Sequence, residues 1–347
     1  MISVFTIHQK NEWTSYVQKA NQFDFYHTWF YHSLDSSGDP MLFVYQENDD
    51  FIALPLLKRP IPGTPYFDLI SVYGYAGPIS NREFENLSEL FMENFKIGLL
   101  TYLRKNNIIS VFSRLHPFFN QDGLIQKFGG LHDNGKTVVI DLTIPLEEQR
   151  KRYRRNHLAT VKQQRKRGFT VKEASTQEEI LQFIDIYTEN MKRIGATEYY
   201  LFNEEYFVKL LQATEFEGKL ILVYFEGEVI CGSIITCTQD IVQGHLIGTR
   251  SDYLHYSPAK FLVDEITLLA RKMGMKYYQL GGGLGFKEDS LFNWKKGFSE
   301  YFLDYRSWRF IVNEEVYYQL VDEKGIDRNL DIDFFPLYRC NLVHQEC

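Results

Sequence analysis

The chain has 347 residues, of which 44% are hydrophobic, 16% aromatic and 24% charged, and its formal net charge is −7. This length allows two domains with a sizeable core, and the composition is that of a globular protein. The acidic balance argues against a general nucleic-acid-binding protein, although it is compatible with a local basic patch. No apolar run approaches the roughly 18 residues that cross a bilayer. Because the sequence also shows no signal-peptide pattern, we expect a cytoplasmic protein without a transmembrane segment.

The first half of the chain alternates helical and strand-like patterns. In order, it predicts a helix at 11–20, an aromatic-rich stretch at 23–34, a β-hairpin at 42–57, a strand at 66–75, a long helix from about 81 to 105, and strands at 108–115 and 137–142. The hairpin is predicted by two apolar runs around the polar turn at 47–50. The long helix is predicted by apolar residues at helical spacing.

A basic segment at 150–167 contains nine Lys and Arg residues and no acidic residue. Two interpretations of this segment stay open. A run of like charges is commonly the solvated face of a helix. Alternatively, the segment contacts phosphates, because uncompensated cations repel one another at a cost that an inert surface would avoid.

The second half of the chain continues the alternation. The expected elements are a strand at 169–173, a helix at 177–194, a hairpin at 220–236 that turns at 226–227, a strand at 242–249 and a helix from 258 to 272. Two further strands are expected, one that begins at 277 and one at 301–311. Ser257 and Pro258 predict the start of the last helix, with Ser257 as its N-cap and Pro258 at its first position.

The two halves resemble each other. A hairpin, a strand, a long helix and a further strand occur twice in the same order, offset by about 170 to 180 residues, which is the size of one domain. We therefore expect an α/β (α+β) fold of two tandem domains, each with a mixed sheet flanked by helices. The expected domains are residues 1–145 and 146–347, and the tail of the second could pack back on the first.

The four cysteines, Cys231, Cys237, Cys340 and Cys347, have the spacing of neither zinc ligands nor a disulfide framework. Cys231 and Cys237 lie in an apolar run, so we expect buried thiols there. The sequence shows no nucleophilic Ser/His/Asp order and no P-loop, and nothing in it predicts a metal site or a redox cofactor.

The segment 276–298 reads KYYQLGGGLGFKEDSLFNWKKGF. Its four clustered glycines suit neither a helix nor a strand interior, because each loses much backbone entropy on folding. They predict a loop in which the backbone approaches another group closely, followed by a short helix at 289–296. The lysine pair at 295–296 could be a solvated surface pair or part of a site.

The strand, the GGG-x-G loop and the W-K-K-G-F run at 294–298 resemble the C-terminal signature of the Fem-type aminoacyltransferases, which consist of two GNAT-like (N-acetyltransferase) domains. The resemblance implies an enzyme that transfers an acyl or aminoacyl group to an amino group of a cell-wall or surface-polysaccharide precursor. It implies a nucleotide- or lipid-linked glycan precursor as acceptor and aminoacyl-tRNA or acyl-coenzyme A as co-substrate. No permanently bound cofactor and no membrane contact beyond a peripheral one are implied.

The resemblance also implies site residues. Lys295 is the expected catalytic residue, because attack of an amine on an ester or thioester puts negative charge on one oxygen, which a cation stabilises. The expected substrate-binding residues lie in and around the glycine loop and in aromatic and strand-end clusters of the first domain: Tyr278, Gly282, Gly283, Phe298, Trp29, Tyr31, Arg114 and His116. Taken singly, each of the first-domain residues fits a core position slightly better than a binding position.

The donor site is expected where the chain enters the helix at 258. Coenzyme-A-dependent relatives cradle the pyrophosphate in a glycine-rich turn at a helix N-terminus, whereas the turn RSDYLHYSPAK at 250–260 contains no glycine. The helix start and its cations remain able to meet a phosphate. The expected phosphate-contacting residues are Arg152, Arg154, Arg155, Arg250, Ser257 and Lys260.

Two alternatives stay open beside this function. One is an acetyl-coenzyme-A-dependent N-acetyltransferase that acts on an amino-sugar nucleotide. The other is a non-catalytic protein that uses the duplicated fold to bind a carbohydrate or nucleotide. The donor that binds and the effect of replacing Lys295 distinguish these three functions.

Overall fold

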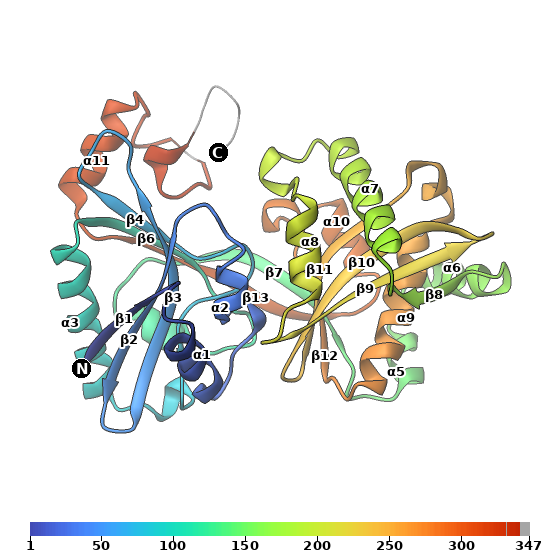
Figure 1. The fold of residues 1–347 in the computed structure, drawn as a ribbon, viewed down its shortest axis with the longest axis horizontal. Coiled ribbons are helices and arrows are strands. Elements are labelled where there is room, and N and C mark those ends of the chain that lie inside the picture. Colours follow the sequence, from blue (N-terminus) through green and yellow to red (C-terminus); the bar gives the residue numbers. More distant parts are fainter. Residues whose placement is uncertain (331, 341–347) are drawn as a thin grey trace. The chain divides into compact units, whose positions relative to one another are not determined.

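A computed structural model describes residues 1–330 and 332–340, and the chain forms two compact units (Figure 1). Unit 1 contains residues 1–134 together with the chain from residue 305 onward, and unit 2 contains residues 135–304. The sequence suggested a division near residue 145, with a tail of the second domain that could pack back on the first. The boundaries of the two units fall inside the strands Leu131–Asp141 and Tyr301–Ile311.

The sheet of unit 1 follows the order β1 (Ile2–Thr6), β2 (Asp39–Glu47), β3 (Asp50–Pro60), β4 (Phe67–Ile70), β6 (Ile108–Arg114) and β13 (Tyr301–Ile311). The short β5 (Ile79–Ser80) pairs with β3. Neighbours are antiparallel except β4 and β6, which are parallel. Helix α3 (Glu89–Lys105) makes the crossover that a parallel pair requires.

The sheet of unit 2 repeats this plan with the order β8 (Thr170–Glu173), β9 (Glu217–Phe225), β10 (Glu228–Thr238), β11 (Ile241–Thr249), β12 (Tyr277–Gly281) and β7 (Leu131–Asp141). Here β11 and β12 are the parallel pair, and α9 (Pro258–Lys272) makes the crossover. In both units the last strand runs antiparallel to its neighbour, and each of these two strands, β7 and β13, crosses a boundary between the units in the sequence. The predicted duplication of an α/β unit is therefore confirmed.

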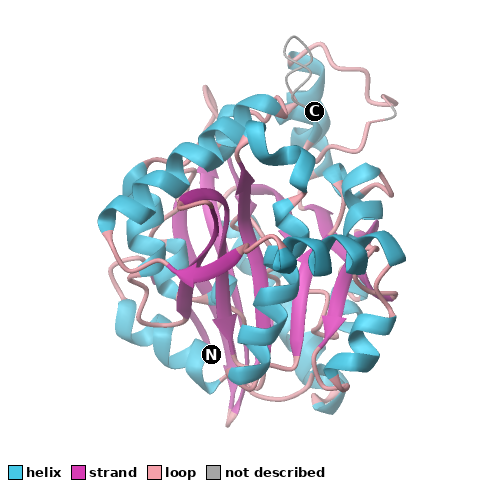
Figure 2. Cartoon of the chain, turned by 90° about the vertical axis from the view of Figure 1, so that its right-hand side faces the viewer, coloured by secondary structure: helices cyan, strands magenta, loops and turns pink. Residues whose placement is uncertain are grey.

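Helices flank the strands in both units, as Figure 2 shows. Those not yet named are α1 (Lys10–Lys19), α2 (Trp29–His32), α4 (Asp122–Gln126), α5 (Leu146–Lys151), α6 (Arg155–Lys166), α7 (Gln177–Arg193), α8 (Glu204–Leu211), α10 (Ser290–Lys295) and α11 (Glu314–Glu323). In unit 1, α3 packs its buried side chains on residues such as Phe43 and Leu54 of the hairpin. Alternate residues of a strand point to opposite faces, so one hairpin can serve two helical layers.

In unit 2 the two faces of the sheet are covered by different helices. Val161 of α6 and Phe261 of α9 share one core with Val223 of β9. The other face meets α7, and a Cβ atom on Gly232 would lie 2.7 Å from the ring of Phe183. Glycine at this position therefore lets α7 approach the strand closely. The result is a sheet with α6 and α9 on one side and α7 on the other.

Several local predictions are confirmed and several are wrong. Both hairpins form, and Glu226 and Gly227 take the positive φ angles, 53° and 85°, that a tight turn requires. The long helix begins at Glu89 and not near residue 81, because Ser88 caps it by accepting a hydrogen bond from the amide of Phe91. The strand expected at 66–75 covers only β4, and β1, α8 and α11 are not predicted.

The cysteines divide into two groups. Cys231 and Cys237 are buried free thiols, as expected. Cys340 is disulfide-bonded, which the spacing of the cysteines did not predict. Cys347 lies outside the described residues. Among residues 1–330 and 332–340, no helix has both the length and the apolar character needed to cross a membrane.

Candidate functional site

The glycine loop of unit 2 directly follows β12. Gly281 and Gly285 adopt φ angles of 77° and 57°, which favour glycine. At Gly283 the constraint is space: a Cβ atom would lie 2.1 Å from the carbonyl oxygen of Lys287 and 2.3 Å from Oδ1 of Asp289. The cluster of glycines is therefore explained by backbone turns at two positions and by a close approach at a third.

Helix α10 begins at this loop and is tied to it by Asp289. The carboxylate of Asp289 accepts hydrogen bonds from the amide of Phe292, at 2.8 Å, and from the amide of Leu284, at 3.0 Å. The first bond caps the helix, and the second holds the loop. Burial opposes ionisation of Asp289, but these bonds and the charge of Lys295 outweigh it and lower the pKa of the carboxyl group.

Lys295, the last residue of α10, reaches back to the same loop. Its ammonium donates a hydrogen bond of 2.6 Å to the carbonyl oxygen of Gly282. Burial lowers the pKa of Lys295 to about 8, and the charge of Asp289 opposes this shift. At neutral pH the ammonium form still dominates. The loop thus holds a partly desolvated cation that can also release its proton under mildly alkaline conditions.

Lys296 lies in a different environment, with its ammonium 5.3 Å from the ring centre of Phe302. Phe298 is fully buried and packs edge-on against Trp294 at 5.2 Å. At Gly297, a Cβ atom would lie 2.3 Å from Nε2 of His157. The W-K-K-G-F run therefore directs only one of its two lysines to the loop, and its glycine admits a neighbouring imidazole.

His157 of α6 is this neighbour, and sequence reasoning missed it. Its buried ring lies with Nε2 3.1 Å from the carbonyl oxygen of Trp294 and packs edge-on against Phe298 at 4.7 Å. Burial first, and then the positive charge of Lys260, lower the pKa of His157 to about 4. A neutral ring with its proton on Nε2 fits this contact. No local sequence pattern predicts the contact between His157 and Trp294, because the two residues are 137 positions apart.

The basic segment is partly compensated in the fold. Arg150 makes a two-fold hydrogen-bonded ion pair with the buried Asp264, at 3.0 and 2.5 Å, and Arg165 binds Asp264 at 3.1 Å and also Glu265. Lys151 pairs with Glu148 at 2.6 Å. The premise that all nine cations lack counter-charges is therefore wrong. Arg150, Lys151 and Arg165 have acidic partners, and those of Arg150 and Arg165 lie far away in the sequence.

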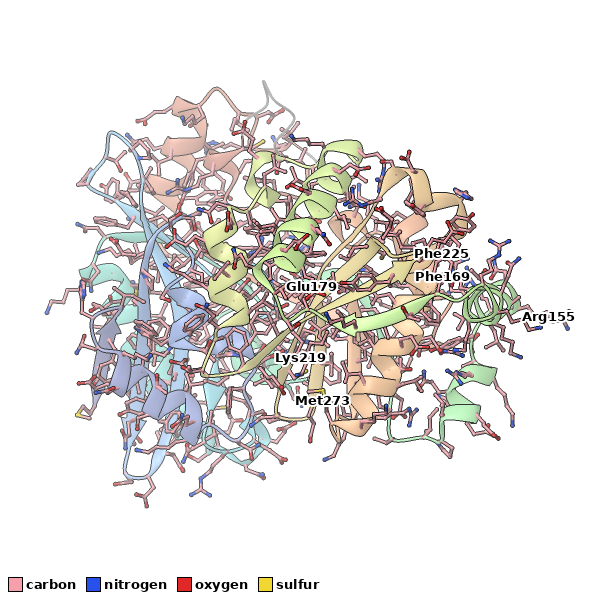
Figure 3. All side chains as sticks on the ribbon, turned by 45° about the vertical axis from the view of Figure 1, so that its right-hand side comes forward. Arg155, Phe169, Glu179, Lys219, Phe225 and Met273 are labelled. Carbon is pink, nitrogen blue, oxygen red and sulfur yellow. The ribbon has the colours of Figure 1, made fainter. Side chains whose placement is uncertain are left out.

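The three arginines predicted to contact phosphates are all exposed, but they are not equivalent. The guanidinium of Arg154 donates to the carbonyl oxygen of Asn293, at 2.9 Å. The backbone amide of Arg154 donates to the carbonyl oxygen of Gly297, at 2.8 Å. Arg152 and Arg155 make no ion pair in the described part of the chain, and Arg155 points outward from α6 (Figure 3). Arg154 thus connects α6 to α10, and the other two arginines are open to solvent.

The start of α9 is built differently from the prediction. Ser257 adopts a left-handed conformation with φ 53°, and its side chain makes no capping hydrogen bond, although the helix does begin at Pro258. Gln164 of α6 donates to the carbonyl oxygens of Tyr256 and Ser257, at 2.9 Å for the latter. Burial lowers the pKa of Lys260, which is half-buried in the first turn. This helix start therefore rests against α6.

The remaining candidates of unit 2 are engaged in its structure. Arg250 donates from Nε to the carbonyl oxygen of Val229 at 2.9 Å. Tyr278 is buried in the core, and burial raises the pKa of its hydroxyl. Beside it, β11 and β12 pair only from Ile241 to Gln243 and then part. The separation leaves the ends of the two strands unpaired with each other on the side where α9 begins.

The candidates of unit 1 are also held by structural contacts. Trp29 donates from Nε1 to the carbonyl oxygen of Ile7 at 2.8 Å, and Tyr31 donates to that of Tyr73 at 3.1 Å. His116 lies with Nε2 2.9 Å from the carboxylate of Asp24, both side chains being buried. Arg114 lies 5.0 Å from the ring centre of Phe112. None of these four predicted residues lines the pocket of unit 1 described next.

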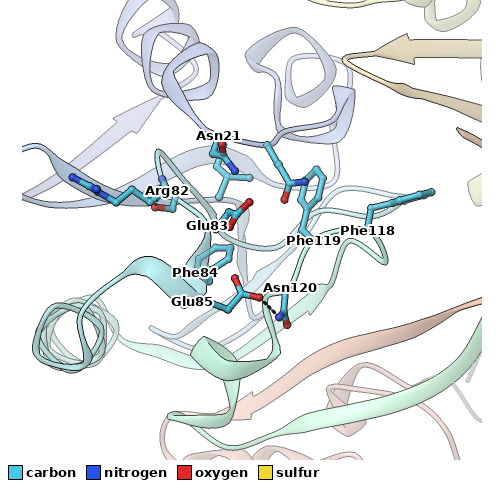
Figure 4. Close-up of a pocket in the computed structure, with 11 residues that line it drawn as sticks. Asn21, Arg82, Glu83, Phe84, Glu85, Phe118, Phe119 and Asn120 are labelled. Atoms are coloured by element: carbon cyan, nitrogen blue, oxygen red, sulfur yellow. Dashed lines mark hydrogen bonds between the residues drawn. The ribbon is translucent and has the colours of Figure 1, made fainter. Parts of the chain in front are cut away.

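That pocket has a volume of about 200 Å³ (Figure 4). It is lined by Asn21, Gln22, Ile79, Ser80, Arg82, Glu83, Phe84, Glu85, Phe118, Phe119 and Asn120. The one link to the predictions is Phe119, whose ring stacks on His116 at 3.9 Å. The structure thus places His116 behind the wall of the pocket and not inside it.

Comparison with known proteins agrees with the geometry of unit 2. Residues 148–296 match the family model described as the acetyltransferase (GNAT) domain. The chain contains a GNAT acyltransferase domain. The matched residues run from α5 through α10 and so include the basic segment, the start of α9, the glycine loop and Lys295. No curated protein matches the sequence of the chain.

Solved structures share the fold at low sequence identity. FemX is 13% identical and superposes with a TM-score of 0.71, covering 91% of this chain and 99% of its own. L-PGS from Bacillus licheniformis gives a TM-score of 0.58 at 14% identity, covering 90% and 96%. The C-terminal domain of a putative lysylphosphatidylglycerol synthetase from Agrobacterium fabrum gives 0.56 at 14% identity, covering 89% and 94%. The expected Fem-type tandem GNAT fold is confirmed. The match to the GNAT domain also confirms the expectation that the chain is an acyltransferase enzyme.

Proposed function

We propose that this acyltransferase transfers an acyl or aminoacyl group to an amino group of a cell-wall or surface-polysaccharide precursor, with Lys295 as its catalytic residue. The observation that carries the proposal is the ammonium of Lys295, which the glycine loop holds at 2.6 Å from the carbonyl oxygen of Gly282. The likeness of the whole chain to FemX supports the type of acceptor. We further propose that the acceptor is nucleotide- or lipid-linked and that the reaction takes place in the cytoplasm.

The reaction needs little from the protein beyond orientation and charge. The acceptor amine attacks the carbonyl carbon of the donor, a C–N bond forms, and the negative charge that develops on the carbonyl oxygen is stabilised by a nearby cation. The C–O or C–S bond to the donor then breaks, and the proton lost by the amine balances the charge of the leaving alkoxide or thiolate. Lys295 supplies the cation, and its lowered pKa reflects the desolvation that strengthens the interaction.

Two donors suit different features of unit 2. Arg152 and Arg155, exposed to solvent on either side of Arg154 in the sequence, suit the phosphates of an aminoacyl-tRNA. The start of α9 directly after β11, beside the point where β11 and β12 part, suits the pyrophosphate of acyl-coenzyme A. The GNAT family match favours the second donor. An acetyl-coenzyme-A-dependent transfer to an amino-sugar nucleotide is therefore the second candidate function.

The test combines both donors with both classes of acceptor. The protein is incubated with acetyl-coenzyme A or with a pool of aminoacyl-tRNAs, together with a nucleotide-linked muropeptide or an amino-sugar nucleotide, and acceptor masses are measured. Transfer from aminoacyl-tRNA to the muropeptide would identify a Fem-type reaction, and acetylation of the amino-sugar nucleotide would identify the second candidate. If both donors bind in calorimetry but no acceptor gains mass, both proposed reactions are refuted.

A further inference from the structure

Asp289 joins the two ends of the loop-and-helix unit that carries Lys295. One of its carboxylate oxygens accepts the amide of Phe292 at the start of α10, and the other accepts the amide of Leu284 in the loop. Two residues before Leu284, the carbonyl oxygen of Gly282 receives the ammonium of Lys295. The loop is thus held on one side by a carboxylate and on the other by the lysine from the end of the same helix.

The fit of the loop around Asp289 is close. Gly283 lies between the two tethered residues, and a Cβ atom there would lie 2.3 Å from Oδ1 of Asp289. Any side chain at this position would displace either the carboxylate or the loop backbone. The backbone therefore passes directly beside the carboxylate. A substitution at Asp289 should displace the neighbouring peptide group, whose Gly282 carbonyl oxygen binds Lys295.

We propose that Asp289 is a positioning residue for Lys295: its carboxylate fixes the loop whose carbonyl group binds the ammonium, and its negative charge retains that ammonium at the loop. This inference rests on the proposed role of Lys295. Asp289 itself takes no part in bond making or breaking. Its function is to keep the cation in one place while the acyl group moves.

The other charged groups near α10 do not replace Asp289. Burial lowers the pKa of Lys295, and Asp289 is the group whose charge opposes that shift. From α6, Arg154 and His157 reach α10 only through backbone carbonyls, and the pKa of His157, about 4, keeps its ring neutral. Lys287, Glu288 and Lys296 are exposed or partly exposed chain neighbours. Removal of the Asp289 charge should therefore lower the pKa of Lys295 further.

The variant Asp289→Asn distinguishes the hydrogen bond that caps α10 from the hydrogen bond that holds the loop at Leu284. Asparagine is as good an N-cap as aspartate, so it can still accept the amide of Phe292. Its amide nitrogen cannot accept the amide of Leu284, and it carries no charge. Glu288→Gln is the matched control, because it removes the same charge from the adjacent, exposed residue, for which no side-chain hydrogen bond to the loop is present among residues 1–330 and 332–340.

The direct readout is the titration of Lys295 in the full chain, followed by NMR of lysines labelled at the ε-carbon. The Lys295 signal is identified by its absence from Lys295→Met. We expect Asp289→Asn to lower the titration midpoint by about half a pH unit, the effect of one nearby screened charge. Turnover at pH 8 should fall about tenfold with KM nearly unchanged, as for a misplaced catalytic group. Glu288→Gln should leave midpoint and turnover as they are.

Two results would overturn the inference: an unchanged Lys295 midpoint in Asp289→Asn, or an equal shift in Glu288→Gln. Asp289→Ser, which also caps a helix but has no charge, should reproduce the shift and serves if the asparagine variant folds poorly. The titration is independent of the reaction. If Lys295→Met retains full turnover, the proposed catalytic role fails, while the midpoint still decides whether Asp289 positions the lysine.

Discussion

Replacing Lys295 by methionine removes the ammonium and keeps an unbranched side chain of similar length. The ammonium lies at the glycine loop, partly desolvated, where its charge acts more strongly on a developing oxyanion than it would in water. Loss of one oxyanion-stabilising group costs about 2.7–4 kcal/mol in the transition state, so we expect turnover to fall by roughly two to three orders of magnitude.

Stability should change much less than turnover. The lowered pKa of Lys295 means that folding opposes the charge, so its removal relieves a cost. Against this, the carbonyl group of Gly282 loses its partner, at a cost of about 1–3 kcal/mol for a buried acceptor. The two effects have opposite signs, so the melting temperature should stay close to that of the wild type. A large loss of stability would make the activity measurement uninformative about charge.

Lys296→Met is the matched control, because Lys296 is the adjacent lysine and lies over the ring of Phe302. Its loss should cost about 0.5–1 kcal/mol of stability at most and leave turnover within a few-fold. The assay is mass detection of the modified acceptor under single-turnover conditions, with the donor that proves active. Equal losses in the two variants, or a loss only in Lys296→Met, would refute the assignment of Lys295.

The same assay gives a pH dependence with a definite sign. If the cation of Lys295 acts, activity should decline as pH rises through about 8, where the ammonium loses its proton. Lys295→Met should lack this alkaline limb. A rise in activity through the same range would instead identify the neutral amine as the active form.

Three further predictions concern the basic segment, the packing of α6 and acid stability. Replacing Arg152, Arg154 and Arg155 together by Gln should weaken donor binding and flatten its dependence on salt, and an unchanged salt slope in calorimetry would leave the segment a solvated face. Gly297→Ala should lower the free energy of unfolding by about 1–3 kcal/mol, because its Cβ atom would meet the ring of His157, whereas Gly123→Ala in the open space of α4 should not. Burial lowers the pKa of His27 to about 3 and those of His32 and His157 to about 4, so the unfolded chain binds more protons between pH 6.5 and 4. Stability should be fully present above pH 6.5 and fall as pH drops through this window, and a constant melting temperature from pH 7 to 4.5 would contradict this.

Elements with a local signal could be predicted from the sequence, and elements decided by distant contacts could not. The hairpin turn at 226–227 and the helix end at 274 follow from Gly227 and Gly274, because glycine readily adopts the positive φ angles found there. The start of α9 was placed correctly from Pro258, but the cap by Ser257 was wrong, since this residue is left-handed and its side chain makes no capping hydrogen bond. Gln164 of α6 donates to the carbonyl oxygen of Ser257 from 93 positions away, and no local propensity encodes such a contact.

The candidate site shows the same limit. Lys295 could be singled out because the run around it resembles a known signature and a catalytic cation suits the chemistry. His157 could not, since a lone histidine in a basic segment has no periodic or spacing signal, and its contact with Trp294 joins residues more than 100 positions apart. The acidic partners of Arg150 and Arg165 were missed for the same reason, and the charge of the segment was overestimated.

These contacts change the meaning of the basic segment. Arg150 and Arg165 anchor it to Asp264 of α9, and Arg154 binds the backbone of α10. A cation that already donates to a carboxylate or a carbonyl group must give up that bond before it binds a phosphate, whereas a solvated one exchanges only water and counterions. Of the three arginines predicted to contact phosphates, Arg152 and Arg155 therefore bind a phosphate at the lower cost. The segment thus combines anchored residues, which hold α6 beside the helix of Lys295, with free residues that can receive a charged donor.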